Sequence, residues 1–145
     1  MVNRWFFPLD KKLNHTEWKH IENEIRLALS DWNTHGKRID FNVHNFFLQV
    51  IVIEAISPTS GCSIDTLQKK VRDVLNAHAL EVLPSQYVMY LKDNELGYFD
   101  FRETESQIQN QTITEETLIL DTQKILEGDE NPLSILRDTW LVRYC

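Results

Sequence analysis

Apolar residues recur at helical spacing in two stretches of the chain. Asn14 and Glu17 precede the first stretch at the spacing of a capping box, and Gly36 follows it as a stop signal. Ser63 is the expected N-cap of the second stretch. The apolar faces of the two predicted helices consist of Trp18, Ile21, Ile25, Ala28 and Trp32, and of Ile64, Leu67, Val71, Val74 and His78.

Strand-forming side chains fill much of the remaining chain. The pattern predicts strands at Arg4–Phe7, Ile39–Val43 and Phe46–Ile56, and a hairpin that pairs Tyr87–Leu91 with Tyr98–Phe101. The Phe46–Ile56 segment is apolar on both faces. We therefore expect it to be a central strand that is covered on both sides.

The pattern is less regular after residue 102. Thr117–Leu120 indicates a short strand, or part of a helix that begins near Thr114. Gly128–Pro132 has the composition of a turn, and Leu133–Trp140 is expected to be a short helix.

The predicted elements follow the order β-α-β-β-α-β through Leu91. This is the ferredoxin-like order, an antiparallel sheet with two helices on one face. With 145 residues, the chain has the length of one domain. We predict a single α+β domain in which residues 1–102 form the core with an added hairpin, and residues 103–145 form an acidic extension packed on it. The extension or a second subunit is expected to cover the sheet face that lacks helices.

Charge is unevenly distributed along the chain. It has 15 Lys and Arg residues against 22 Asp and Glu residues, and the net charge of −7 divides into +1 for residues 1–92 and −8 for residues 93–145. An acidic total disfavours nucleic-acid binding. The acidic third is expected to be solvated surface or to dock on a basic partner. No signal peptide or membrane-spanning run is visible, so we expect a cytoplasmic protein that binds no membrane.

The segment between the predicted central strand and the second helix is the most suggestive of chemistry. Free backbone N–H groups and the helix dipole favour negative charge at such a position. Gly61 is expected to need a positive φ there. The candidate anion or ligand site consists of Ser60, Gly61, Cys62, Ser63 and Asp65.

Cys62 is the candidate for catalysis. A thiolate with a lowered pKa could attack an electrophile or sense oxidants, with His44 or His78 as the base. The structural alternative is a tight turn with a small buried Cys62 and a capping Ser63. The histidines show no metal-binding spacing, and no metal or cofactor is expected. The basic cluster Lys69, Lys70 and Arg72 is interpreted as a solvated helix face.

Three motifs carry a resemblance: Ser60-Gly61-Cys62-Ser63-Ile64-Asp65, Trp32 with His35-Gly36, and Asp138-Thr139-Trp140 with Arg143. From Trp5 to Tyr144 the chain resembles an uncharacterised bacterial family of small proteins that often carry the label "ABC transporter ATPase". That family usually has Ser-Trp-His where this chain has Thr139, Trp140 and Leu141.

The ATPase label can be tested against the glycines. A P-loop needs two glycines at fixed spacing, with the second followed by Lys and then Ser or Thr, and none of the four glycines meets this requirement. No nucleotide binding is expected. The leading hypothesis is a non-enzymatic cytoplasmic binding or interaction domain whose partner is another protein or a second copy. The alternative is a thiol-dependent enzyme or redox sensor that uses Cys62.

Overall fold

The computed structural model describes residues 2–145, which form two compact units that meet in sequence between Leu83 and Pro84. The expected division near residue 102 differs from this boundary. The hairpin that begins at Tyr87 belongs to the second unit, because its first strand also pairs with a strand from the C-terminal third. We call the two parts unit 1 and unit 2.

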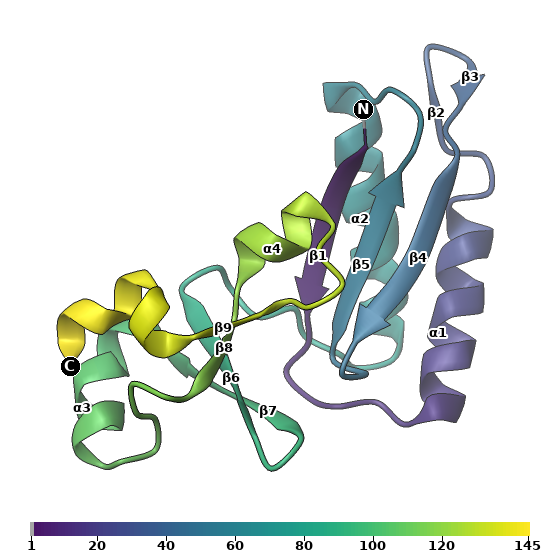
Figure 1. Ribbon diagram of the computed structural model, residues 1–145. Helices are drawn as coiled ribbons and strands as arrows, with labels where there is room; N and C mark the ends of the chain where they lie inside the picture. The colour runs from purple at the N-terminus through teal and green to yellow at the C-terminus, as the bar shows by residue number, and fades with distance from the viewer. Residues whose placement is uncertain (1) are drawn as a thin grey trace. The chain divides into compact units, whose positions relative to one another are not determined.

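Unit 1 contains a three-stranded antiparallel sheet in the order β1-β5-β4, a small hairpin of β2 and β3, and two helices (Figure 1). Its elements are β1 (Asn3–Pro8), α1 (His15–Ala28), β2 (Asn33–Thr34), β3 (Lys37–Arg38), β4 (Phe41–Phe46), β5 (Val50–Ala55) and α2 (Gly61–Ala77).

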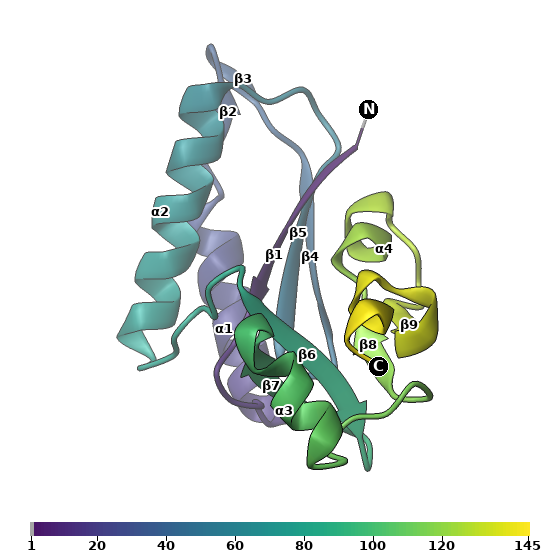
Figure 2. The same ribbon diagram turned by 90° about the vertical axis from the view of Figure 1, so that its left-hand side faces the viewer.

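The core of unit 1 lies between the sheet and the two helices, which cover one face of the sheet (Figure 2). Trp18 and Trp32 are buried there, as predicted. The capping box of α1 is also confirmed. Glu17 N donates to Asn14 Oδ1 at 2.8 Å, and Asn14 N donates to Glu17 Oε1 at 2.9 Å. The helix ends at Ala28, so Gly36 is not its stop. Instead, Gly36 adopts a φ of 82° in the β2–β3 turn.

β5 is the central strand, as predicted, but the expected long strand is wrong at its N-terminal end. The chain turns at residues 47–49, and Phe46, expected to begin the long strand, is the last residue of β4. Phe47 and Leu48 have φ values of 59° and 56°. Bulky residues seldom adopt this left-handed conformation, so the sequence pattern masked the turn. Asn45 Oδ1 stabilises it by accepting a hydrogen bond from Leu48 N at 2.8 Å.

The ferredoxin-like topology is not confirmed, because the described sheet of unit 1 has three strands. The expected fourth strand is present as β6 (Tyr87–Lys92), but it lies in the sheet of unit 2. Next to the C-terminal end of β1 the described chain has the bridge between Leu9 and Val82. Hydrogen bonds run there from Leu83 N to Pro8 O at 2.8 Å and from Asp10 N to Glu81 O at 3.0 Å. Pro84 follows at once, and its ring nitrogen has no proton to donate to a longer ladder.

Unit 2 contains an antiparallel sheet in the order β7-β6-β8-β9. Besides β6, its elements are β7 (Glu95–Asp100), the 3₁₀ helix η1 (Phe101–Glu103), α3 (Thr104–Gln109), β8 (Leu118–Leu120), α4 (Thr122–Glu127), β9 (Leu133–Ile135), and the 3₁₀ helices η2 (Leu136–Asp138) and η3 (Trp140–Tyr144). Its buried core consists of Val88, Phe99, Ile113, Ile119, Leu136 and Leu141.

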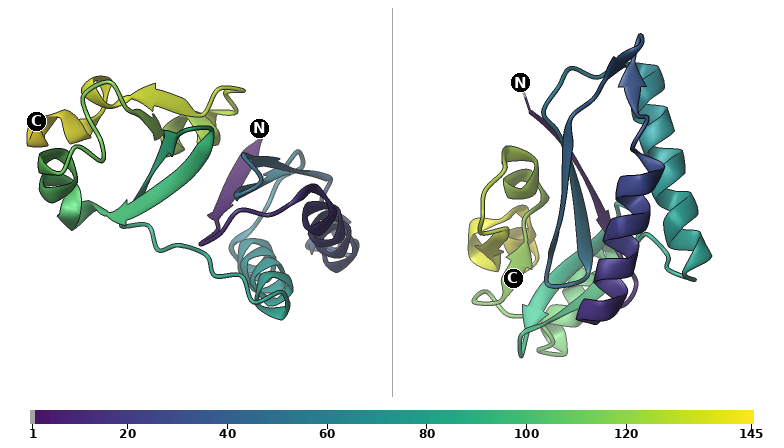
Figure 3. Two further views of the ribbon diagram at one scale, coloured as in Figure 1. Left: turned by 90° about the horizontal axis from the view of Figure 1, so that it is seen from below. Right: turned by 90° about the vertical axis from the view of Figure 1, so that its right-hand side faces the viewer.

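Of two predictions for the C-terminal third, the structure confirms one and contradicts the other. The short strand at Thr117–Leu120 is confirmed as β8. The expected helix over Leu133–Trp140 is wrong, because Leu133–Ile135 pairs with β8 and only short 3₁₀ turns follow. One of these turns, η3, packs beside α3 (Figure 3). In residues 2–145 no helix is both long and apolar enough to cross a membrane.

Candidate functional site

The candidate segment forms the start of α2. Ser60, not Ser63, is the N-cap, and Ser63 occupies the third helical position. Ser63 N donates to Ser60 Oγ at 3.2 Å, and Ser60 N donates to Ser63 Oγ at 2.7 Å. This reciprocal pair has the geometry of a capping box, with a serine in place of the usual Glu or Gln.

Gly61 does not have the positive φ that we expected. It is the first residue of α2, and a Cβ added to it would meet no atom within 4 Å. The N–H groups of the first helical residues have no intrahelical acceptor. Ser60 satisfies the N–H of Ser63, so the N–H groups of Gly61 and Cys62 remain available to a ligand.

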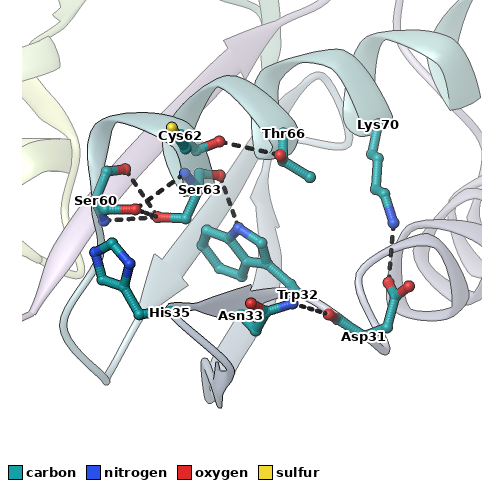
Figure 4. Close-up of a pocket in the computed structure, with 9 residues that line it drawn as sticks. All are labelled: Asp31, Trp32, Asn33, His35, Ser60, Cys62, Ser63, Thr66 and Lys70. Carbon is teal, nitrogen blue, oxygen red and sulfur yellow. Dashed lines mark hydrogen bonds and ion pairs between the residues drawn. The ribbon is translucent and has the colours of Figure 1, made fainter.

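A pocket of about 340 Å³ lies in unit 1 at this helix start (Figure 4). It includes three of the five predicted site residues, Ser60, Cys62 and Ser63, whereas Gly61 and Asp65 do not line it. The other lining residues come from the loop after α1, from the β2–β3 hairpin and from α2: Asp31, Trp32, Asn33, His35, Thr66 and Lys70.

Trp32 fixes the hairpin side of the pocket to the helix. Its Nε1 donates to Ser63 O at 2.7 Å, and its ring is fully buried between the rings of Trp5 and Phe41. A buried indole N–H needs an acceptor, so this bond sets how the loop after α1 lies against α2. The side of the pocket formed by the loop after α1 is therefore rigid.

Lys70 and Asp31 form the charged end of the pocket. Lys70 Nζ lies 2.9 Å from Asp31 Oδ1 and donates to Ala28 O at 3.0 Å. The hydrogen bond and the charge of Lys70 lower the pKa of Asp31. At the other end of the pocket, the ring of His35 lies toward Ser60 (Figure 4).

Cys62 is exposed and not a buried core residue, so the structural alternative is wrong in that respect. The two histidines proposed as its base lie elsewhere. His78 caps the other end of α2, about 24 Å away at 1.5 Å per residue, where its Nε2 lies 2.6 Å from Glu24 Oε2. His44 lies on β4, 4.0 Å from Glu54, and its partial burial lowers its pKa.

The basic and acidic members of the pocket are not among the predicted site residues. The sequence around Lys70 predicts a solvated helix face, and the spacing of His35 indicates no site. One signal could have found Lys70, because Cys62, Thr66 and Lys70 are spaced four residues apart and share a helix face. Asp31 and His35 had no such signal, since only the tertiary fold brings them to α2.

The arrangement suits binding of a small polar group. Its lining includes Cys62, whose backbone N–H lies in the first turn of α2, the Lys70 ammonium group and the His35 imidazole. Residues 2–145 contain no group of three or more His, Cys, Asp or Glu side chains placed to hold a metal ion. No family model, curated protein or solved structure matches this chain.

Proposed function

We propose that unit 1 is a non-enzymatic binding domain whose ligand sits in the pocket at the start of α2. The observation that carries this proposal is the convergence of three separate segments on one pocket at the N-terminal turn of α2. Pockets with a few convergent polar groups are the usual place for small ligands.

The expected ligand carries a small anionic group. The N–H groups of Gly61 and Cys62 point out of a helix N-terminus, where the helix dipole favours negative charge. Lys70 adds a cation at the same pocket, but Asp31 already neutralises it. The pocket therefore offers hydrogen-bond geometry rather than a large positive field, which favours one compact group such as a phosphate or carboxylate.

The two cysteines provide a direct test. Cys145→Ser leaves Cys62 as the sole thiol, and Cys62→Ser leaves Cys145 as a matched exposed reference. We expect inorganic phosphate, at constant ionic strength, to slow the reaction of Cys62 with an aromatic disulfide reagent and to leave Cys145 unaffected. An equal effect of phosphate on the reaction rates of the two thiols, together with unchanged amide NMR shifts at Gly61 and Cys62, would contradict anion binding.

Thiol chemistry at Cys62 is the second candidate. It is favoured by the exposure of Cys62 in the same pocket as His35. Against it, the Cys62 sulfur points away from the His35 ring (Figure 4). If Cys62 is catalytic, its labelling rate at neutral pH should exceed that of Cys145 and should fall in a His35→Gln variant. Similar rates for both thiols would support the binding domain.

The fold type, the family, the location and the partner expected from the sequence are also proposals. We propose that unit 1 is a reduced ferredoxin-like domain; its strand order β1-β5-β4 with two helices on one face supports this. Membership of the bacterial family that the chain resembles rests on the motifs around Ser60–Asp65, Trp32 and Trp140. A cytoplasmic location and a protein partner complete the proposal.

A further inference from the structure

Unit 2 exposes a cluster of aromatic side chains. Trp140 is 50% exposed, and Phe101 and Val142 are 38% and 44% exposed. The Trp140 ring lies edge-on to both Phe101 and Tyr144, with centroids 6.3 Å apart in each case. We call Phe101, Trp140, Val142 and Tyr144 the aromatic surface.

The turn that presents these rings is well anchored. Leu136 and Leu141, on either side of Trp140 in sequence, are both fully buried in the core of unit 2. Thr139 Oγ1 donates to Leu136 O at 2.7 Å and accepts from Leu141 N at 3.2 Å. The exposure of Trp140 therefore belongs to an ordered turn, and such preordered aromatic residues are typical anchors of binding interfaces.

The rings already hold a cation. The guanidinium carbon of Arg143 lies 5.6 Å from the ring centroid of Trp140 and 5.9 Å from that of Tyr144. Among residues 2–145, Arg143 forms no ion pair with a carboxylate. Its contacts are the two rings and a hydrogen bond to Trp140 O at 3.3 Å. The aromatic surface thus has the geometry that attracts guanidinium groups.

Carboxylate residues lie close in sequence to the residues of the aromatic surface, and unit 2 carries the whole net charge of the protein. Unit 1 has 10 Lys and Arg against 10 Asp and Glu, whereas unit 2 has 5 against 12, so the whole charge of −7 resides in unit 2. Glu103, Glu105 and Asp138 are exposed in the segments next to Phe101 and Trp140. Neither Glu105 nor Asp138 forms an ion pair with any residue that the structure describes.

We propose that the aromatic surface of unit 2 binds an arginine-containing basic segment of a partner protein. A partner arginine takes the place of Arg143 over Trp140 and Tyr144, and the neighbouring carboxylates attract the rest of the segment. The acidic surroundings disfavour nucleic acids and anionic membranes as the occupant. This inference concerns unit 2 alone and is independent of the pocket in unit 1.

The test uses the full chain and a fluorescent peptide of alternating Arg and Gly, with Glu-Gly and Ser-Gly peptides as controls. We expect anisotropy to show binding of the Arg peptide only, weakened about tenfold in Trp140→Ala and unchanged in Leu27→Ala, which removes an exposed apolar side chain from unit 1. Arg143→Ala should strengthen binding, because it removes the competing guanidinium and a like charge.

Several outcomes would overturn the proposal. They are equal binding of the Ser-Gly peptide, unchanged affinity in Trp140→Ala, and Trp140-dependent self-association of the chain in sedimentation, which would identify a second copy as the occupant. A further readout needs no variant. In the unmodified chain, the indole N–H resonance of Trp140 should shift on addition of the Arg peptide, while those of the buried Trp18 and Trp32 should stay.

Discussion

Gly97 illustrates how one residue determines local packing in unit 2. It lies opposite Tyr90 in the β6–β7 ladder, and a Cβ built on it would lie 2.5 Å from Tyr90 Cζ and 2.6 Å from Tyr90 Oη. The Tyr90 ring therefore lies directly on the backbone of Gly97. Tyr90 also packs against the core of unit 2, with its ring centroid 5.8 Å from that of Phe99. The ring cannot swing aside without losing these contacts.

We expect Gly97→Ala to lower the free energy of unfolding of unit 2 by about 1–3 kcal/mol, because the added methyl group overpacks this contact. Urea unfolding followed by circular dichroism measures the loss. In a Tyr90→Ala background the same substitution should cost much less, since the clashing ring is absent. Equal costs in both backgrounds would show that Tyr90 does not set the requirement for glycine.

At the scale of elements, the start of α2 depends on Ser60 and not on Gly61. Ser60→Ala removes the N-cap and should lower stability by about 1 kcal/mol. Gly61→Ala should raise stability by up to about 1 kcal/mol, because alanine favours the helix and its Cβ meets open space. Thermal unfolding of both variants measures the two effects. A lower melting temperature for Gly61→Ala would indicate that the helix start needs glycine.

Elements could be predicted from the sequence where local signals agree with packing. The capping box of Asn14 and Glu17 is one such case. The turn of the β6–β7 hairpin is another, since Asp93 and Asn94 tolerate its left-handed conformation, although β7 begins at Glu95 and not at Tyr98. The turn at Phe47 and Leu48 could not be predicted, because its residues contradict local preference. Such a conflict is resolved only by tertiary contacts.

In the candidate site, too, some residues could be predicted from the sequence and others could not. Ser60 and Cys62 were predictable, because a helix start follows an apolar strand in the sequence. Asp31 and His35 lie 25 or more residues before Ser60, and they reach the pocket only through the loop after α1 and the β2–β3 turn. Their register depends on the buried bond between Trp32 and Ser63, which no spacing rule encodes.

At the scale of the whole molecule, the second face of the unit 1 sheet is apolar at one end and carries the Arg4–Glu54 ion pair at the other. Val50 and Val52 of β5 point away from the helix-side core, and Phe6 and Phe46 lie beside them on β1 and β4. The expectation that a later part of the chain or a second copy covers this face stays a prediction. A fragment that ends at Leu83 should therefore self-associate.

Light scattering of that fragment and of the full chain measures the effect. We expect the fragment to form dimers or larger species, and Val52→Thr to weaken their association by making the centre of the face more polar. A fragment that stays folded and monomeric at high concentration would show that the face needs no cover.

The turn between β4 and β5 has a consequence for the order of folding. Holding Phe47 and Leu48 in the left-handed region costs roughly 1–2 kcal/mol per residue, so this hairpin does not close favourably by itself. It is held by hydrogen bonds from Leu9 N to Gln49 O and from Leu13 N to Leu48 O, both 2.8 Å, which come from the segment between β1 and α1.

The β4–β5 hairpin should therefore close late, after the segment before α1 has docked, although its strands are adjacent in sequence. In rapid-mixing kinetics, Phe47→Asn should change the rate of unfolding and leave the rate of folding unaltered. The Asp93–Asn94 turn of unit 2 should behave in the opposite way, and Asn94→Ala should slow folding, because that turn can form before the rest of its unit. Of two hairpins of similar length, β6–β7 would thus form early in folding and β4–β5 late.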